Sequence, residues 1–114
     1  MRSLVAVLIL VTAADPTEEK FKLLAERDRV VTFTATWCGP CRQQHAENKV
    51  LEKAGIPVLY IDIDQEPDLF RYCTGGGMIP RTIILRKGKV AASYRGVTDA
   101  GTIKERWTEL TRPS

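Results

Sequence analysis

Two cysteines separated by two residues are the part of this sequence with the clearest chemistry. They occur in Trp37-Cys38-Gly39-Pro40-Cys41, between a segment with strand character and one with helical character. Cys38 would lie at a helix N-terminus, where unpaired N–H groups and the positive end of the helix dipole stabilise a thiolate. Cys41 would lie further into the helix, less exposed, and Pro40 suits the first turn because its missing N–H costs nothing there. The pattern predicts an exposed thiolate that attacks a target disulfide and a buried thiol that resolves the mixed disulfide.

A structural metal site is the alternative use of these cysteines. Cys38, Cys41, His45 and Cys73 would supply four ligands of the types that zinc takes. Cys41 and His45, however, lie on the helix that the motif itself begins, and Cys73 has no second cysteine near it. A haem-attachment motif is excluded because Arg42, not histidine, follows Cys41. We therefore favour a redox pair, with Cys73 as a packed or idle thiol and His45 as a surface residue of the helix.

Composition limits the other classes of function. The chain has 114 residues, 44% apolar and 27% charged, which predicts one globular domain over residues 1–114. The net charge of +3 is small and evenly spread, so we expect no nucleic acid and no anionic membrane as partner. Three cysteines are too few, and odd in number, for a secreted disulfide scaffold. No apolar run approaches the roughly 20 residues of a membrane helix.

The N-terminal segment allows two interpretations. Residues 4–11 are uniformly apolar, Arg2 precedes them and Thr12-Ala13-Ala14 follows. Residues 1–14 could be a short signal peptide, which would make the protein an exported one. The run also has the length and β-branched content of a buried strand that stops at Asp15-Pro16, and we favour this strand.

Helical and strand patterns alternate over the rest of the chain. Asp15-Pro16 begins a helix as an N-cap followed by proline at the first helical position. A β-branched strand precedes the cysteine motif, and Ile103, Trp107 and Leu110 give the last helix its apolar face. The predicted elements are a strand at 30–35, a helix from near Cys38 to Lys53, a strand at 58–63, a short helix at 67–72 broken by Gly75-Gly76-Gly77, hairpin strands at 82–85 and 89–94, and a helix from near Asp99. This order, β-α-β-α-β-α-β-β-α, predicts an α/β fold.

The sequence resembles the thioredoxin family over nearly its whole length. Residues 36–42 resemble the active-site segment of that family, and Met78-Ile79-Pro80-Arg81-Thr82 resembles the segment with its cis-proline, which faces the redox disulfide. Residues 87–92 are similar to the final hairpin, Gly96 to a glycine of the substrate groove, and residues 62–67 to the stretch after the third strand.

The resemblance implies a fold, a reaction and partners. The fold would be a mixed sheet of about five strands in the order 1-3-2-4-5, with helices on both faces. The protein would be a monomeric thiol–disulfide oxidoreductase in a cytoplasm-like compartment, without metal or cofactor, that reduces protein disulfides and takes electrons from a reductase of the thioredoxin-reductase type. Cys38 would attack and Cys41 would resolve. The substrate groove would be formed by Trp37, Gly39, Pro40, Ile79, Pro80 and Gly96, with the triple glycine freeing backbone to approach an extended substrate. The alternative is a docking module that keeps the fold while its redox centre is incidental.

Three positions depart from the family pattern. Thr32 stands where the family usually buries an aspartate, and Tyr60 stands where a lysine commonly partners that aspartate. Ala46 replaces a proline that often kinks the active-site helix. The changes at positions 32 and 60 belong together, because a cation has nothing to pair with once the carboxylate is gone. They leave the disulfide chemistry intact but remove a potential proton acceptor for Cys41.

Overall fold

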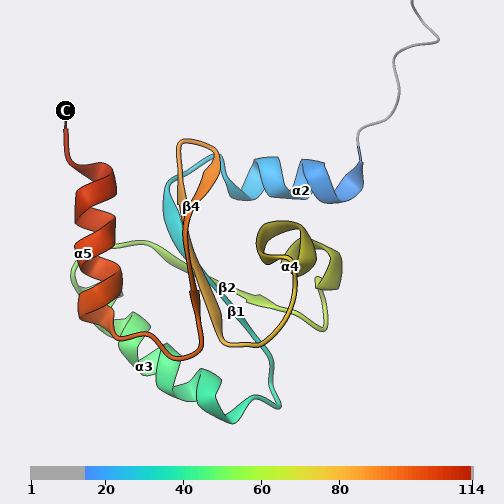
Figure 1. Cartoon of the computed structure of the whole chain (residues 1–114), viewed down its shortest axis with the longest axis horizontal. Helices are drawn as coiled ribbons and strands as arrows, with labels where there is room; N and C mark the ends of the chain where they lie inside the picture. Colours follow the sequence, from blue (N-terminus) through green and yellow to red (C-terminus); the bar gives the residue numbers. More distant parts are fainter. Residues whose placement is uncertain (1–14, 114) are drawn as a thin grey trace, which may run out of the picture.

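A mixed sheet of four strands lies at the centre of the computed structural model, which describes residues 15–113 (Figure 1). Strand β1 (Arg29–Thr34) runs parallel to β2 (Val58–Asp62) and antiparallel to β3 (Arg81–Arg86), and β3 pairs antiparallel with β4 (Lys89–Arg95). The order β2-β1-β3-β4 equals the last four positions of the predicted order. The predicted first strand, residues 4–11, lies outside the described residues.

Helices cover both faces of the sheet, as predicted. The helices are α2 (Pro16–Leu24), α3 (Gly39–Lys53), α4 (Pro67–Thr74) and α5 (Ala100–Thr111). Asp15 caps α2 by accepting the Thr17 N–H at 2.8 Å, and Asp99 caps α5 by accepting the Thr102 N–H at 3.2 Å. The Asp15 cap was predicted from the sequence, and the last helix was predicted to begin near Asp99. None of the helices in residues 15–113 has the length and apolar character needed to span a bilayer.

Two apolar clusters fill the space between sheet and helices. β1 and β3 are buried on both faces, so their side chains contribute to both clusters. The first cluster lies against α2 and α4 and contains Leu24, Ala25, Val31, Phe33, Ile61, Leu69, Phe70, Ile83 and Leu85. The second lies against α3 and α5 and contains Val30, Leu51, Ile56, Ile84, Ala100 and Ile103. Trp107 and Leu110 pack against the second cluster, as the helical spacing predicted.

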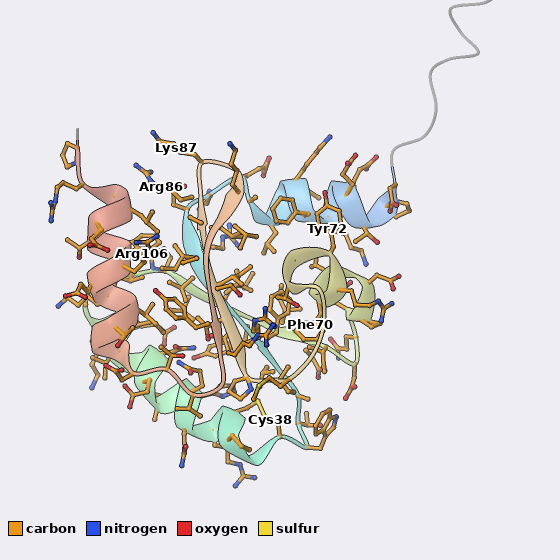
Figure 2. The ribbon with its side chains drawn as sticks, viewed as in Figure 1. Cys38, Phe70, Tyr72, Arg86, Lys87 and Arg106 are labelled. Carbon is orange, nitrogen blue, oxygen red and sulfur yellow. A yellow bond between two sulfur atoms is a disulfide. The ribbon has the colours of Figure 1, made fainter. Side chains whose placement is uncertain are left out.

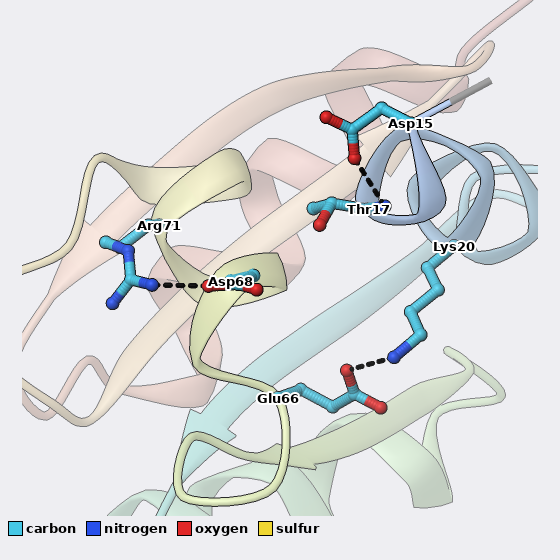
Figure 3. A network of polar contacts seen from close by, with 6 residues as sticks. All are labelled: Asp15, Thr17, Lys20, Glu66, Asp68 and Arg71. Carbon is cyan, nitrogen blue, oxygen red and sulfur yellow. Dashed lines mark hydrogen bonds and ion pairs between the residues drawn. The ribbon is translucent and has the colours of Figure 1, made fainter. Parts of the chain in front are cut away.

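Helices α2 and α4 are also joined across their outer surfaces. The Lys20 ammonium lies 2.8 Å from the Glu66 carboxylate (Figure 3), and the rings of Phe21 and Tyr72 lie 5.3 Å apart. Figure 3 also shows the Asp15 cap and an ion pair between Arg71 and Asp68 within α4. These contacts hold α4 in place, and the loop that follows α4 leads to the predicted cis-proline.

The turn between β3 and β4 lies at the end of the sheet where β1 begins. Lys87 and Gly88 have φ of 52° and 78°, as the two central residues of a type I′ hairpin require. The Asp28 carboxylate accepts the Lys87 N–H at 3.0 Å and pairs with Arg86, whose Nε donates to the Leu110 carbonyl at 2.8 Å. The hydrogen bond from the Lys87 N–H lowers the pKa of Asp28, and Arg86 lowers it further. This cluster ties β1, the hairpin and α5 together.

Candidate active site

The cysteine motif closes a disulfide at the N-terminal end of α3 (Figure 2). Cys38 is the N-cap of the helix, and its Sγ accepts the Cys41 N–H at 3.2 Å. Cys38 is 7% exposed and Cys41 is 1% exposed, so the predicted order of exposure is correct. The expectation that Cys38 is exposed is wrong for the disulfide form, because the two cysteines form an apolar cluster with Ala35 and the side chains of Ile63 and Ile79 pack against this cluster.

The position of Cys38 favours its ionised form once the disulfide is reduced. A helix N-terminus presents unpaired N–H groups and the positive end of the dipole, and the Cys41 N–H already points at the Cys38 sulfur. Pro40 lies in the first turn, where no N–H is needed. A side chain at Gly39 would meet open space, so this residue leaves the backbone beside the disulfide uncovered. The arrangement suits Cys38 for nucleophilic attack on a disulfide.

Trp37 projects from the surface next to the disulfide. It is 65% exposed, and its indole N–H donates to the Asp64 carboxylate at 2.7 Å. Asp64 follows β2 in a turn that the Asp62 side chain closes by accepting the Asp64 N–H at 2.8 Å. Asp64 was not predicted as a site residue, although the Asp-x-Asp pattern after a strand is a turn signal that pointed to it.

The segment with Ile79 and Pro80 lies beside the disulfide. The Ile79–Pro80 peptide bond is cis, and Ile79 packs against the cluster that contains both active-site cysteines. The Gly96 N–H donates to the Pro80 carbonyl at 2.9 Å, which joins the start of the loop after β4 to this segment. Gly96 has φ of +75°, and a side chain there would lie 3.9 Å from the Met78 methyl group. Of the residues predicted for the groove, Ile79 thus packs with the two cysteines, and Gly96 is joined to the same segment through Pro80.

Thr32 is fully buried in β1 and takes part in a chain of neutral hydrogen bonds. Its Oγ1 lies 3.1 Å from the Thr82 hydroxyl and accepts the Asn48 amide N–H at 2.8 Å. The Gln44 amide donates to Asn48 Oδ1 at 3.0 Å and exchanges two hydrogen bonds with the backbone of Thr98. These uncharged groups occupy the place where the resemblance implied a carboxylate.

The residues of α3 in this chain of hydrogen bonds were not predicted. Cys41, Gln44, Asn48 and Leu51 are the buried residues of the helix and have the spacing of a single helical face. Two amide side chains on a buried face are a signal that a polar partner lies opposite, because buried polar groups are hydrogen-bonded. No buried side-chain polar atom in residues 15–113 lacks a partner.

His45, predicted as a surface residue of the helix, is half-buried. Its Nε2 lies 3.1 Å from the Thr34 hydroxyl, and its ring lies 4.5 Å from the ring of Tyr60. Tyr60 is the neighbour of Thr32 in the register of β1 and β2, and burial raises the pKa of its hydroxyl. His45 therefore packs along the β1–β2 pair on the α3 side of the sheet.

The third cysteine is separate from this site. Cys73 packs against the cluster formed by α2, α4 and the sheet, and burial raises the pKa of its thiol to about 11. Within residues 15–113, no three His, Cys, Asp or Glu side chains lie close enough together to hold a metal ion, so the four zinc ligands considered above are not gathered. A cavity of about 300 Å³ lies between the starts of β1 and β2, lined by Arg27, Asp28, Arg29, Pro57, Val58 and Leu59, while the disulfide follows the opposite end of β1.

Known proteins are similar to this chain in sequence and in fold. The family model described as thioredoxin matches residues 11–109. Thioredoxin of Rhodospirillum rubrum is 34% identical over 100 residues, which are 84% of this chain and 93% of that protein. The structure of mitochondrial thioredoxin 3 from Saccharomyces cerevisiae, in its oxidized form, matches with a TM-score of 0.71 and 23% identity over 81% of this chain and 89% of that one. A mutant thioredoxin from Halobacterium salinarum matches with a TM-score of 0.72 and 22% identity, over 90% of this chain and 99% of that one.

Proposed function

This chain belongs to the thioredoxin family and is a thiol–disulfide oxidoreductase, and from this premise we propose that it works as a reductase of protein disulfides. The observation that carries the proposal is the Cys38–Cys41 disulfide at the start of α3, next to Ile79 and Pro80. The Gly-Pro pair between the cysteines resembles the reducing members of the family.

The reaction proceeds in two exchanges between sulfurs. In the reduced protein, the Cys38 thiolate attacks one sulfur of the target disulfide, and the other target sulfur leaves as a thiolate. The Cys41 thiol then loses its proton and attacks the Cys38 sulfur of the mixed disulfide. This step forms the Cys38–Cys41 bond seen here and releases the second target sulfur. Two electrons and two protons pass from the protein to its target, and a reductase must return them.

A turnover assay tests the function. The protein is incubated with insulin and a small excess of dithiothreitol, and precipitation of the reduced insulin chain is followed by turbidity. We expect the parent protein to accelerate precipitation and the Cys38→Ser variant to match the reaction without protein. Equal activity of the two proteins would instead support the docking module, in which the redox centre is incidental.

The proposal also covers the cellular compartment, the oligomeric state and the partners of the protein. We place it in a reducing, cytoplasm-like compartment, as a monomer without membrane or nucleic-acid partners, with a thioredoxin-reductase-type enzyme as electron donor. The small net charge of +3 supports the absence of a strongly anionic partner. N-terminal sequencing of the protein from its native host tests the location. An N-terminus at residue 1 or 2 is expected, whereas loss of residues 1–14 would mean export.

A further inference from the structure

The loop that leads from α4 to Pro80 contains three consecutive glycines. Gly75, Gly76 and Gly77 have φ of 82°, 88° and 105°, in the region that side chains disfavour. Glycine loses more backbone freedom on folding than any other residue, so this loop is costly to order. Met78, which follows, is 55% exposed and adds little packing. The loop that carries Ile79 to the disulfide therefore needs to be held by other residues.

Arg81 supplies such contacts. It directly follows Pro80, begins β3 and is only 6% exposed. Its Nη1 donates to the Gly76 carbonyl at 3.1 Å, its Nη2 to the Thr74 carbonyl at 3.2 Å, and its Nε to the Ser93 hydroxyl at 3.1 Å. The planar guanidinium thus joins the end of α4, the glycine loop and strand β4 in a single contact, which a flexible point charge cannot do.

The buried charge of Arg81 is stabilised by neutral groups and not by a carboxylate. The salt bridges within residues 15–113 do not include Arg81, so backbone carbonyls and a hydroxyl are its observed partners. Ile83 and Leu85, which share its side of β3, pack in the apolar cluster next to α2 and α4. A charge buried without a carboxylate is expensive, although the carbonyl at the C-terminal end of α4 favours a cation. Two of the three hydrogen bonds of the guanidinium go to the carbonyls of Thr74 and Gly76, so the end of α4 and the glycine loop account for most of its partners here.

We propose that Arg81 is a positioning residue for the binding of protein substrates. Its guanidinium fastens the loop at Thr74 and Gly76 to the β3–β4 hairpin, and so holds the backbone of Met78 and Ile79 beside Cys38. Arg81 does not touch the reacting sulfurs and acts through Ile79. This inference rests on the proposed function, because it concerns how a protein substrate is held during reduction.

The test compares a protein substrate with a small one. In Arg81→Gln, we expect the KM for insulin to rise about tenfold with kcat within about twofold of the parent, because a misplaced loop weakens binding and leaves the sulfurs unchanged. Reduction of a small aromatic disulfide, which needs only Cys38, should stay within about twofold of the parent. Arg81→Lys keeps the charge and loses the planar fork, so its KM should stay as high as that of Arg81→Gln. If Arg81→Gln does not fold, Arg81→Lys serves for the same comparison.

Arg86→Gln is the matched control. Arg86 ends the same strand and also donates to a backbone carbonyl, that of Leu110, far from the disulfide. Its loss should lower the stability to urea and leave the KM for insulin unchanged. Deuterium uptake by residues 74–79 should increase in the Arg81 variants and not in Arg86→Gln.

Three results would overturn the inference: a parental KM in the Arg81 variants, full recovery in Arg81→Lys, or an equal rise of KM in Arg86→Gln. Failure of the proposed function is distinguishable from these, because the parent protein would then turn over neither insulin nor the small disulfide.

Discussion

The two ends of the sheet are held together by different kinds of contact. At the disulfide end, the contacts are neutral hydrogen bonds, as between Thr32 and Asn48, and a buried arginine that binds carbonyls. At the other end, the Asp28–Arg86 ion pair fixes a tight hairpin turn and the last turn of α5. Figure 2 shows this separation, with Cys38 at one end of the molecule and Arg86 and Lys87 at the other.

The difference indicates a division of tasks between the ends. The disulfide end has exposed apolar side chains, among them Trp37 and Met78, that a substrate can cover. At the hairpin end, the Asp28 carboxylate pairs with Arg86 and with the Lys87 N–H. We therefore expect substitutions at the disulfide end to change activity, some of them together with stability, and substitutions at the hairpin end to change stability alone.

The largest effect is expected for Cys41→Ser. The first attack by Cys38 should proceed and the second exchange should stop, so turnover should fall by about 10³-fold or more and a mixed disulfide through Cys38 should accumulate. Mass spectrometry after an acid quench detects the adduct, and the Cys38→Ser variant is the control. An adduct through Cys73 instead would contradict the assignment of activity to the disulfide end, because the reactive thiol would then not lie at the start of α3.

The buried thiol of Cys73 should react much more slowly than the thiol of Cys38. With a pKa of about 11, Cys73 remains protonated at pH 8, and its thiolate fraction should rise about tenfold for each pH unit up to pH 10. In the reduced protein at pH 8, we expect iodoacetamide to modify Cys73 about 100-fold more slowly than Cys38. Peptide mass mapping after timed quenching measures both rates. Equal rates at pH 8 would contradict the burial of this thiol.

A carboxylate at position 32 tests the uncharged hydrogen bonds that surround Thr32. Thr32→Asp should lower the stability near neutral pH by about 1–3 kcal/mol, the usual scale for an imperfectly satisfied buried polar group. Burial should raise the pKa of the new carboxyl group, so part of the loss should be recovered as the pH falls through that pKa. If the new group reaches Cys41, resolution of mixed disulfides should become about 10²-fold faster.

Urea melts and stopped-flow exchange measure the two effects, and Thr32→Asn, of similar size and uncharged, is the control. An Asp variant as stable as the parent and no faster would mean that Thr32 does not lie beneath the active site.

The smallest effect is expected at the hairpin end. Asp28→Asn should lower the stability by about 1 kcal/mol, because the ion pair with Arg86 is partly exposed. The pKa of Asp28 is lowered in the folded protein, so its contribution is present above about pH 4 and is lost as the pH falls through the folded pKa. Urea melts between about pH 2.5 and pH 7 should therefore converge for parent and variant at the acid end. A change in the rate of insulin turnover in Asp28→Asn would contradict the expectation that the hairpin end affects stability alone.

Local signals in the sequence predicted most of the fold. Asp15-Pro16 was predicted as a helix cap, the last helix was predicted to start near Asp99, and Lys87-Gly88 lies in the predicted turn. The cysteine motif predicted the disulfide and the start of α3. Each of these signals depends on residues a few positions apart, whose side chains and backbone interact locally.

The contacts that were missed join residues far apart in the chain. Gln44 meets Thr98, and Asn48 meets Thr32, only after α3 has packed on the sheet. Arg81 was expected in a connection before a strand at 82–85, and an arginine after a proline gives no sign of burial. Its burial depends on the glycine loop and strand β4 meeting around its side chain. Neither the hydrophobic pattern nor the secondary-structure propensity of the sequence predicts such a contact between distant segments.

The position of α5 has a practical consequence. Its outer surface contains the exposed residue Thr108, close to the carbonyl of Leu110 that Arg86 binds, and its last turn lies with the hairpin, away from Cys38 (Figure 2). An azide-bearing amino acid in place of Thr108 would accept an alkyne linker there, and this linker reacts with neither the lysines nor the cysteines. Reduced Cys41→Ser protein coupled to a bead or an electrode through that linker would present Cys38 on the side away from the support, and proteins that Cys38 attacks would stay bound as mixed disulfides.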